Sequence, residues 1–295
     1  MVYHLARILC LYFDFEGIVV GNNDTNHGVF NYDLVFPSIS VEELAASISD
    51  DDVLIAGPAF SSHCFGFKCR GRKVMYIQAF TTFRLLDCRF DHYVSVSGFV
   101  QKFISNTYGI DTIVVPPFIL VDTFPSPKPW QERPPASILI SLKGDNTEQI
   151  LLLDRLKQIL ATRLPGFSLD NIFECKRPQR ELIARMGECR YFLTLSSAEG
   201  FGLMPLEAMA METTVLGFDG FGGRDYMRSG INCAVKAYPD IEGVADQILS
   251  AIANPEYAEA LAKAGRLTAQ QSQYTYGHFR KAWREQFSHF LGKAM

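Results

Sequence analysis

The sequence predicts an α/β protein with two domains, each built on a parallel β-sheet, and three observations support this. Short apolar runs alternate with longer segments of helical spacing along most of the 295 residues, as in parallel βαβ units. A chain of this length with 48% hydrophobic residues is long enough for two cores. The proline-rich segment 121–136 has the composition of a stiff linker. We therefore expect domains at 1–120 and 137–274.

The expected elements follow from apolar spacing and from turn residues. In the first domain, helical spacing predicts helices at 2–13, 41–49 and 99–108, and short apolar runs predict strands at 17–21, 34–36, 53–56, 73–77, 93–97 and 112–115. In the second domain, strands are expected at 138–141, 171–174, 191–195 and 213–217, and helices at 150–164, 179–186, 241–253, 255–271 and from Pro205 onward. Aromatic residues at helical spacing predict a last helix at 276–291.

The stretch 193–210 organises the second domain. A short apolar strand is followed by a polar, glycine-rich turn and then by Pro205, which opens a run of good helix formers. Gly200 and Gly202 let the backbone come close to a ligand. The helix beginning near Met204 offers N–H groups and the positive end of its dipole to an anion.

Two carboxylates flank this expected anion site. Glu199 lies in the turn and Glu207 lies in the first turns of the helix. A carboxylate beside a phosphate is repelled, so both are better used to accept hydrogen bonds from neutral hydroxyls on either side of it. A ligand with a phosphate between a sugar and a ribose is a nucleotide-sugar. The alternative is an ordinary strand-to-helix connection.

The segment from Glu199 to Glu207 resembles the Glu-x7-Glu signature of retaining glycosyltransferases of the GT-B fold, particularly family 4. The strand and glycine-rich loop at 215–225 resemble the next part of that family's pattern. The resemblance implies two Rossmann-like domains that face a central cleft, with the helix at 275–295 packed back on the first. It also implies a hexosyltransferase that moves a sugar from a nucleoside diphosphate to a glycan, lipid or small-molecule acceptor with retention.

By this resemblance Glu199 holds hydroxyls of the transferred sugar near the reacting carbon, and Glu207 holds those of the ribose. The remaining expected donor-binding residues are Gly200, Phe201, Gly202, Leu203, Met204, Gly222, Gly223 and Arg224. Lys143 matches the family's phosphate-binding lysine, with a solvated turn residue as its alternative. The preceding arginine of the family has no counterpart, so Arg177, Arg180 and Arg224 are open candidates for a second cation.

In the first domain, candidate residues follow strands expected at 53–56 and 73–77, because parallel sheets bind ligands at the carboxyl ends of their strands. His63 is a candidate catalytic residue that faces the cleft; its alternative is a histidine hydrogen-bonded within a loop. Gln78, Thr81 and Thr82 are candidates for the acceptor side.

Composition limits the partners. A net charge of −4 gives no basic field for nucleic acid. Seven scattered cysteines without a zinc spacing favour a reducing cytoplasm. Asp50, Asp51 and Asp52 are interpreted as a solvated lead-in to a strand.

We expect no cofactor and no metal, since cationic side chains can neutralise the charge of the diphosphate. No apolar run reaches the roughly 20 residues of a membrane span, so only peripheral association with a membrane is open. The sequence does not set the oligomeric state.

Two alternative functions keep the donor site: a nucleotide-sugar hydrolase or epimerase, and a non-catalytic binding module.

A further expectation concerns the first domain. Residues 2–13 resemble the family's first helix and residues 17–21 its second strand, so the domain is expected to lack the family's opening strand and glycine-rich loop.

Overall fold

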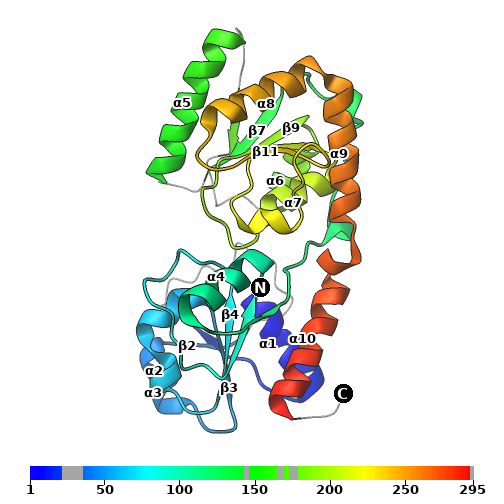
Figure 1. Cartoon of the computed structure of the whole chain (residues 1–295). Helices are drawn as coiled ribbons and strands as arrows, with labels where there is room; N and C mark the ends of the chain where they lie inside the picture. The colour runs from blue at the N-terminus through cyan, green and yellow to red at the C-terminus, as the bar shows by residue number, and fades with distance from the viewer. Residues whose placement is uncertain (22–35, 143–145, 165–168, 173–178, 293–295) are drawn as a thin grey trace. The chain divides into compact units, whose positions relative to one another are not determined.

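The computed structural model describes residues 1–21, 36–142, 146–164, 169–172 and 179–292 (Figure 1). The chain divides into two compact units. The first unit comprises Met1–Pro117 and Tyr276–Met295, and the second comprises Phe118–Thr275. Each unit is built on a parallel sheet with helices, as the alternation of strands and helices predicts.

The first unit has a parallel sheet in the order β3-β4-β5-β6. Its strands are β3 (Val53–Ala56), β4 (Arg72–Ile77), β5 (His92–Ser95) and β6 (Ile113–Val114). Five of the six residues of β4 are buried, because helices cover both faces of a parallel sheet. A separate parallel pair joins β1 (Val19–Val20) to β2 (Ser38–Ile39). The expected strand at 34–36 falls mostly outside the described residues.

The helices of the first unit carry the expected end signals. Ser40 and Glu43 form a capping box at the start of α2. Ser97 caps the start of α4, and Gly109 caps its end in the left-handed conformation. The helices are α1 (Val2–Phe13), α2 (Val41–Ser47), α3 (Phe65–Lys68), α4 (Gly98–Tyr108) and α10 (Tyr276–Leu291), with a 3₁₀ segment η2 (Pro58–His63). The segments η2 and α3 are too short for a periodic pattern to predict.

Helix α10 supplies aromatic side chains to the core of the first unit. Phe279, Trp283 and Phe287 are at most 1% exposed. The Trp283 ring lies edge-on to Tyr76 of β4, with 5.0 Å between ring centroids. The Phe287 ring lies edge-on to Phe13 of α1, with 6.1 Å between ring centroids. The last helix of the chain is therefore part of the first unit's core.

The second unit has a five-stranded parallel sheet in the order β11-β10-β9-β7-β8. The strands are β7 (Ile138–Ser141), β8 (Leu169–Ile172), β9 (Tyr191–Thr194), β10 (Thr214–Phe218) and β11 (Ala234–Lys236). Numbered from β7, the spatial order is 2-1-3-4-5, which is a doubly wound topology. The direction of winding reverses between β7 and β9, so that point is where such sheets bind ligands.

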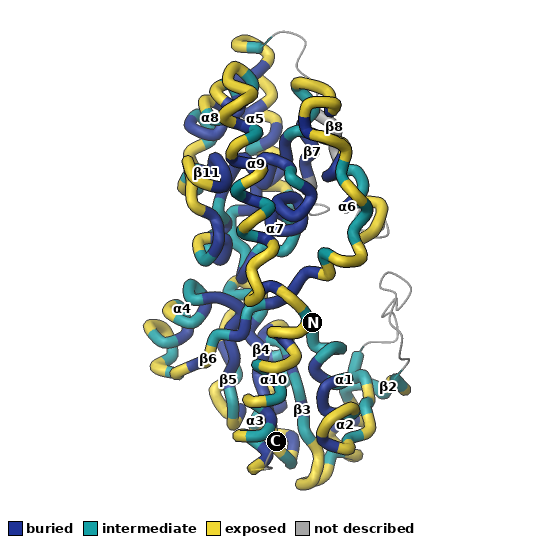
Figure 2. Tube along the Cα trace, turned by 90° about the vertical axis from the view of Figure 1, so that its right-hand side faces the viewer, coloured by how far each residue is buried: buried dark blue, intermediate teal, exposed yellow. Residues whose placement is uncertain are grey.

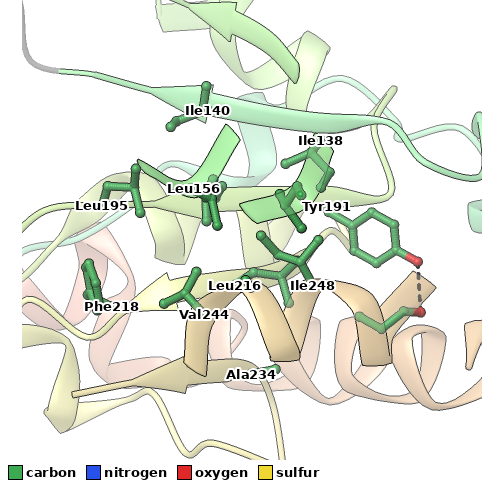
Figure 3. Close-up of a cluster of buried hydrophobic side chains, with 14 of the residues drawn as sticks. Ile138, Ile140, Leu156, Tyr191, Leu195, Leu216, Phe218, Ala234, Val244 and Ile248 are labelled. Carbon is green, nitrogen blue, oxygen red and sulfur yellow. Dashed lines mark hydrogen bonds between the residues drawn. The ribbon is translucent and has the colours of Figure 1, made fainter. Parts of the chain in front are cut away.

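The core of the second unit gathers alternate residues of its strands on one face (Figure 3). Leu156 of α5 and Val244 and Ile248 of α8 join this cluster, and the Tyr191 hydroxyl donates to the Ala251 carbonyl oxygen at 3.0 Å. Figure 2 shows buried residues along the strands and exposed residues on the outer turns of the helices. The helices are α5 (Thr147–Arg163), α6 (Gln179–Met186), α7 (Leu203–Ala210), α8 (Ile241–Ala253) and α9 (Pro255–Ala269), with 3₁₀ segments η3 (Val121–Thr123), η4 (Trp130–Glu132), η5 (Gly222–Asp225) and η6 (Ser272–Tyr274).

The proline-rich segment 121–136, expected as a stiff linker, packs into the second unit. Trp130 is 3% exposed and Arg133 is 1% exposed. Arg190 lies over the Trp130 ring, with its guanidinium carbon 4.4 Å from the ring centroid, and its Nε donates to the Arg133 carbonyl oxygen at 2.9 Å. Composition does not reveal that a tryptophan and an arginine anchor the segment in the second unit.

The Arg133 guanidinium is hydrogen-bonded to backbone carbonyls and a hydroxyl. Its Nε donates to the Lys128 carbonyl oxygen at 2.9 Å. Its Nη1 and Nη2 donate to further oxygens around the starts of β9 and β10: the carbonyls of Cys189, Met211 and Glu212 and the Thr213 hydroxyl, at 2.9 to 3.1 Å. Burial lowers the pKa of this guanidinium. One side chain therefore joins the proline-rich segment to two strands.

Replacing Arg133 by Met should destabilise the second unit by about 3 kcal/mol or more, because several buried carbonyls lose their donor and each unsatisfied group costs roughly 1 to 3 kcal/mol. Trp130 lies in the second unit and Trp283 in the first, so Trp130 fluorescence in a Trp283→Phe background reports the second unit in urea. The control is Lys128→Met, whose exposed side chain forms a surface ion pair with Glu188. An Arg133 variant as stable as this control would contradict the role of the guanidinium.

Candidate functional site

The candidate site lies at the carboxyl ends of β7 and β9, where the winding of the second sheet reverses. The expected catalytic Lys143 follows β7 in the sequence, but it lies outside the described residues. The loop after β9 is described throughout and carries Glu199 and the glycines.

The two glycine-rich loops of the sequence are hydrogen-bonded to each other. The Glu199 N–H donates to the Gly220 carbonyl oxygen at 2.7 Å, and the Gly222 N–H donates to the Glu199 carbonyl oxygen at 3.1 Å. A Cβ atom added at Gly222 would lie 2.2 Å from the Gly200 carbonyl oxygen. Only glycine therefore fits this contact, which places the loop after β10 against the loop after β9.

Helix α7 begins at Leu203, one residue before the expected start near Met204. Gly202 is its N-cap with φ of 85°, a conformation that favours glycine. The Tyr226 hydroxyl donates a hydrogen bond to the Gly202 carbonyl oxygen, and the Tyr226 ring packs against Phe201 with 5.1 Å between centroids. Tyr226 therefore fixes the turn that leads into α7.

The two glutamates have different surroundings. Glu199 accepts a hydrogen bond from the Ser196 hydroxyl at 2.8 Å. Glu207 is 6% exposed and accepts from the Gln179 side-chain amide at 2.6 Å. Burial raises the pKa of the Tyr226 hydroxyl, and the nearby charges of Glu199 and Glu207 raise it further. Glu199 thus lies in the loop that leads into α7, and Glu207 lies buried within α7 itself.

Burial raises the pKa of the Glu207 carboxyl from 4.5 to about 7, while the hydrogen bond from Gln179 acts in the opposite direction. The site thus contains a carboxyl group that changes charge near neutral pH. A ligand hydroxyl that donates to this group would favour its ionised form.

The loop after β10 contains a residue in a strained backbone conformation. Phe221 has φ of 66°, which is uncommon for a residue other than glycine. Its N–H donates to Asp219 Oδ1, and the other oxygen of Asp219 accepts from Arg224 at 2.8 Å. The Arg224 guanidinium lies 4.6 Å from the Phe221 ring centroid. Of the second-cation candidates, Arg224 is therefore on the loop that contacts Glu199.

The other cation candidates are placed differently. Arg180 is exposed on α6, next to the Gln179 that contacts Glu207. Arg177 lies outside the described residues. The remaining expected donor residues, Leu203, Met204 and Gly223, lie in the two loops and in the first turn of α7.

A further carboxylate, Glu148 in the first turn of α5, joins neighbouring loops. It accepts from the Ser197 hydroxyl at 2.6 Å and from the Tyr238 hydroxyl. These hydrogen bonds lower the pKa of Glu148. The loop that carries Glu199 is thereby attached to α5 and to the residues after β11.

The candidates of the first unit lie at the carboxyl end of its sheet. His63 is in η2 directly after β3, and its ring stacks on Phe65 with 5.3 Å between centroids. Its Nδ1 has no hydrogen-bond partner among the described residues, so this atom does not support the alternative of a loop-bonded histidine. Gln78 follows β4 directly, and Thr81 and Thr82 are exposed. Strands β3 and β4 are neighbours, so His63 and Gln78 follow adjacent strands.

Sequence reasoning missed Tyr226, Gln179 and Glu148. Tyr226 has a weak signal, since it follows the second glycine-rich loop closely. Gln179 and Glu148 have no signal, because each stands in an ordinary first turn of a helix and acquires its role only through the tertiary contact.

Comparison with known proteins gives one family match and several structural matches. Residues 170–268 match the family model described as Glycosyl transferases group 1. This region is about a third of the chain and contains both glutamates and both glycine-rich loops. The chain has no match among curated proteins.

Three solved structures illustrate the likeness. The first is S. aureus TarM in complex with fondaparinux, alpha-GlcNAc-glycerol and UDP, with 15% identity, a TM-score of 0.66, and coverage of 85% of this chain and 58% of that one. Sucrose-phosphate synthase from Thermosynechococcus elongatus gives 12% identity, a TM-score of 0.70, and coverage of 99% and 92%. Anabaena HepE with UDP and glucose gives 12% identity, a TM-score of 0.66, and coverage of 86% of each chain.

The chain has the GT-B fold. At these identities the likeness establishes the fold alone, and it confirms the expected fold class. The chain spans 58% of the length of TarM.

Within the described residues, no helix is both long and apolar enough to cross a bilayer, and no three His, Cys, Asp or Glu side chains gather as metal ligands.

The titration of Glu207 gives a test of its burial. In the unfolded chain its pKa is the ordinary 4.5, and in the folded chain it is about 7. Its contribution to stability is therefore complete below pH 4.5 and is lost as the pH rises through about 7. Glu207→Gln should remove this loss, which amounts to about 3 kcal/mol at most. Urea unfolding of the second unit, followed by Trp130 fluorescence near pH 4.5 and well above pH 7, measures it.

The control for this test is Glu188→Gln, which changes an exposed carboxylate of the same unit. The control should keep the pH dependence of the parent chain. If Glu207→Gln also keeps it, the carboxyl of Glu207 is not desolvated in the folded protein.

Proposed function

We propose that this chain is a glycosyltransferase that moves a sugar from a nucleoside diphosphate to an acceptor hydroxyl. The observation that carries the proposal is the placement of Glu199 and the buried Glu207 on one loop-helix segment after β9, where the winding of the second sheet reverses. The family match over residues 170–268 supports it. The UDP bound to TarM and to HepE supports UDP as the first nucleotide to test.

The two glutamates take different parts of the donor. Glu207 accepts hydrogen bonds from the ribose hydroxyls, and its buried position beside Gln179 keeps water away from that contact. Glu199, on the loop that precedes α7, accepts hydrogen bonds from hydroxyls of the transferred sugar. Backbone groups of Gly200, Phe201 and Gly202 complete the sugar contacts.

The diphosphate lies between these two contacts, next to the N-terminus of α7. When the bond between the anomeric carbon and the phosphate oxygen breaks, its electron pair leaves with the diphosphate, and the acceptor oxygen bonds to the carbon. The acceptor's proton passes to the departing phosphate. Lys143, together with Arg224 or Arg180, neutralises the leaving group. A lysine at this charge contributes roughly 3 to 4 kcal/mol, against about 0.3 to 1 for a helix terminus, and no metal or cofactor is required.

The first unit provides the acceptor side. His63 and Gln78 follow adjacent strands, and Thr81 and Thr82 follow Gln78 in the same exit segment. We assign His63 to catalysis and the other three to the acceptor, which is a glycan, a lipid or a small molecule. Retention of the anomeric configuration, hexosyl transfer within family 4, a role in polysaccharide biosynthesis and a cytoplasmic location complete the proposal.

The experiment separates the two glutamates. A thermal-shift screen with UDP-, GDP-, ADP- and TDP-sugars first identifies the donor, because a ligand at 100 times its dissociation constant adds about 2.7 kcal/mol of stability. Glu207→Gln should then weaken binding of the free nucleoside diphosphate about 10-fold to 100-fold, since a hydrogen bond to a charged group is worth roughly 1.5 to 3 kcal/mol. Glu199→Gln should leave that affinity nearly unchanged and slow transfer by a similar factor. Calorimetric titration and a coupled transfer assay measure the two effects.

Glu188→Gln is the matched control and should equal the parent chain in both assays. Equal loss of diphosphate affinity in the two glutamate variants would contradict their separate roles. Donor cleavage at the same rate with and without every acceptor would instead identify a hydrolase. Binding without any turnover would identify a non-catalytic module.

A further inference from the structure

Two apolar side chains of the first unit point into solvent. Phe67 on α3 is 75% exposed and Leu85 is 72% exposed, which makes them the most exposed large apolar side chains in the described part of the chain. Their neighbours Phe65 and Leu86 are 5% and 2% exposed. The buried neighbours fix the backbone, so the exposed side chains are held outward by ordered structure.

The segments that carry these two side chains are joined. The Gly66 N–H donates to Asp87 Oδ2 at 2.8 Å, and the Arg89 N–H donates to Asp87 Oδ1 at 3.1 Å. The Arg89 guanidinium lies 5.7 Å from the centroid of the Phe67 ring. Phe67 and Arg89 therefore share one surface, and Leu85 lies two residues before the Asp87 that joins the two segments.

The segment 64–91 is basic although the chain is acidic. Residues 64–91 contain six lysines or arginines and two aspartates, whereas the whole chain has a net charge of −4. Asp87 binds backbone N–H groups, and Asp91 pairs with Lys73 at 3.5 Å. Four exposed cations have no carboxylate partner in the described part of the chain: Lys68, Arg70, Arg84 and Arg89.

We infer that Phe67, Leu85 and these four cations form a basic-apolar patch that binds the surface of an anionic lipid bilayer. A phenylalanine and a leucine flanked by cations match a membrane interface, where apolar side chains enter the acyl boundary and cations contact the headgroups. The cores of protein interfaces are instead depleted of lysine and built on contiguous apolar area. The inference is independent of sugar transfer.

The expected strength follows from the number of groups. Each lysine or arginine near an anionic membrane improves binding about fivefold. Reversing two of them should weaken binding about 25-fold or more. Removing two apolar side chains that enter the bilayer should weaken it about tenfold or more.

Cosedimentation of the full chain with vesicles tests the patch. We expect binding to phosphatidylcholine vesicles that contain phosphatidylglycerol, little binding to pure phosphatidylcholine vesicles, and weaker binding at high salt. Phe67→Ser with Leu85→Ser tests the apolar part, and Arg84→Glu with Arg89→Glu tests the charges. Circular dichroism and tryptophan fluorescence check that each variant stays folded.

Two control variants change similar residues elsewhere. Ile231→Ser with Leu267→Ser removes two apolar side chains of the second unit that are 67% and 69% exposed. Lys157→Glu with Lys281→Glu reverses two exposed lysines. Both controls should bind vesicles within about twofold of the parent chain, against the tenfold or greater losses in the patch variants.

Three outcomes would overturn the inference. The first is no binding to anionic vesicles. The second is equal weakening in a control and its matched patch variant. The third is unchanged vesicle binding when Phe67 and Leu85 are replaced. In the first case, binding to soluble dextran sulfate would identify a site for polyanions in general.

Discussion

The second unit depends on one buried guanidinium. Arg133 satisfies carbonyl oxygens at the C-terminal end of α7 and before β9, and it binds the Thr213 hydroxyl just before β10. These groups lie at the amino ends of the same strands whose carboxyl ends carry the site. Burying a charge costs several kcal/mol unless hydrogen bonds surround it. The proline-rich segment and the two strands must therefore keep the geometry that satisfies it.

Helix α7 is fixed at both ends by this arrangement. Arg133 binds the Met211 carbonyl beyond its C-terminus, and Tyr226 binds the Gly202 carbonyl at its N-terminus. All six residues from Pro205 to Ala210 are buried. Glu207 is therefore held in a place that excludes water, and this desolvation is what raises its pKa to about 7. A carboxylate on a looser or more exposed helix would have its ordinary pKa and a less defined direction.

Sequence reasoning predicts those features that depend on local pattern. It gives helices 179–186, 241–253 and 276–291 with the observed bounds, because their apolar spacing is regular. It also predicts that the two glycine-rich loops belong to one site, and Gly222 against Gly200 shows why both glycines are needed. Arg133 and Gln179 could not be found in this way, because each acquires its partners only when distant segments meet. Lys143 stays a prediction, since it lies outside the described residues.

In the first unit, apolar residues of the same types are buried at some positions and exposed at others, and backbone geometry explains the difference. In α10 the aromatic residues repeat every four positions, so they share one face and are buried together. On α3, Phe65 and Phe67 are two positions apart, which places them on opposite sides of the helix. Leu85 and Leu86 are adjacent in an irregular segment, and Leu86 is buried whereas Leu85 is exposed. Burying Phe65 therefore places Phe67 outward, and the exposed apolar surface follows from how these short segments are anchored.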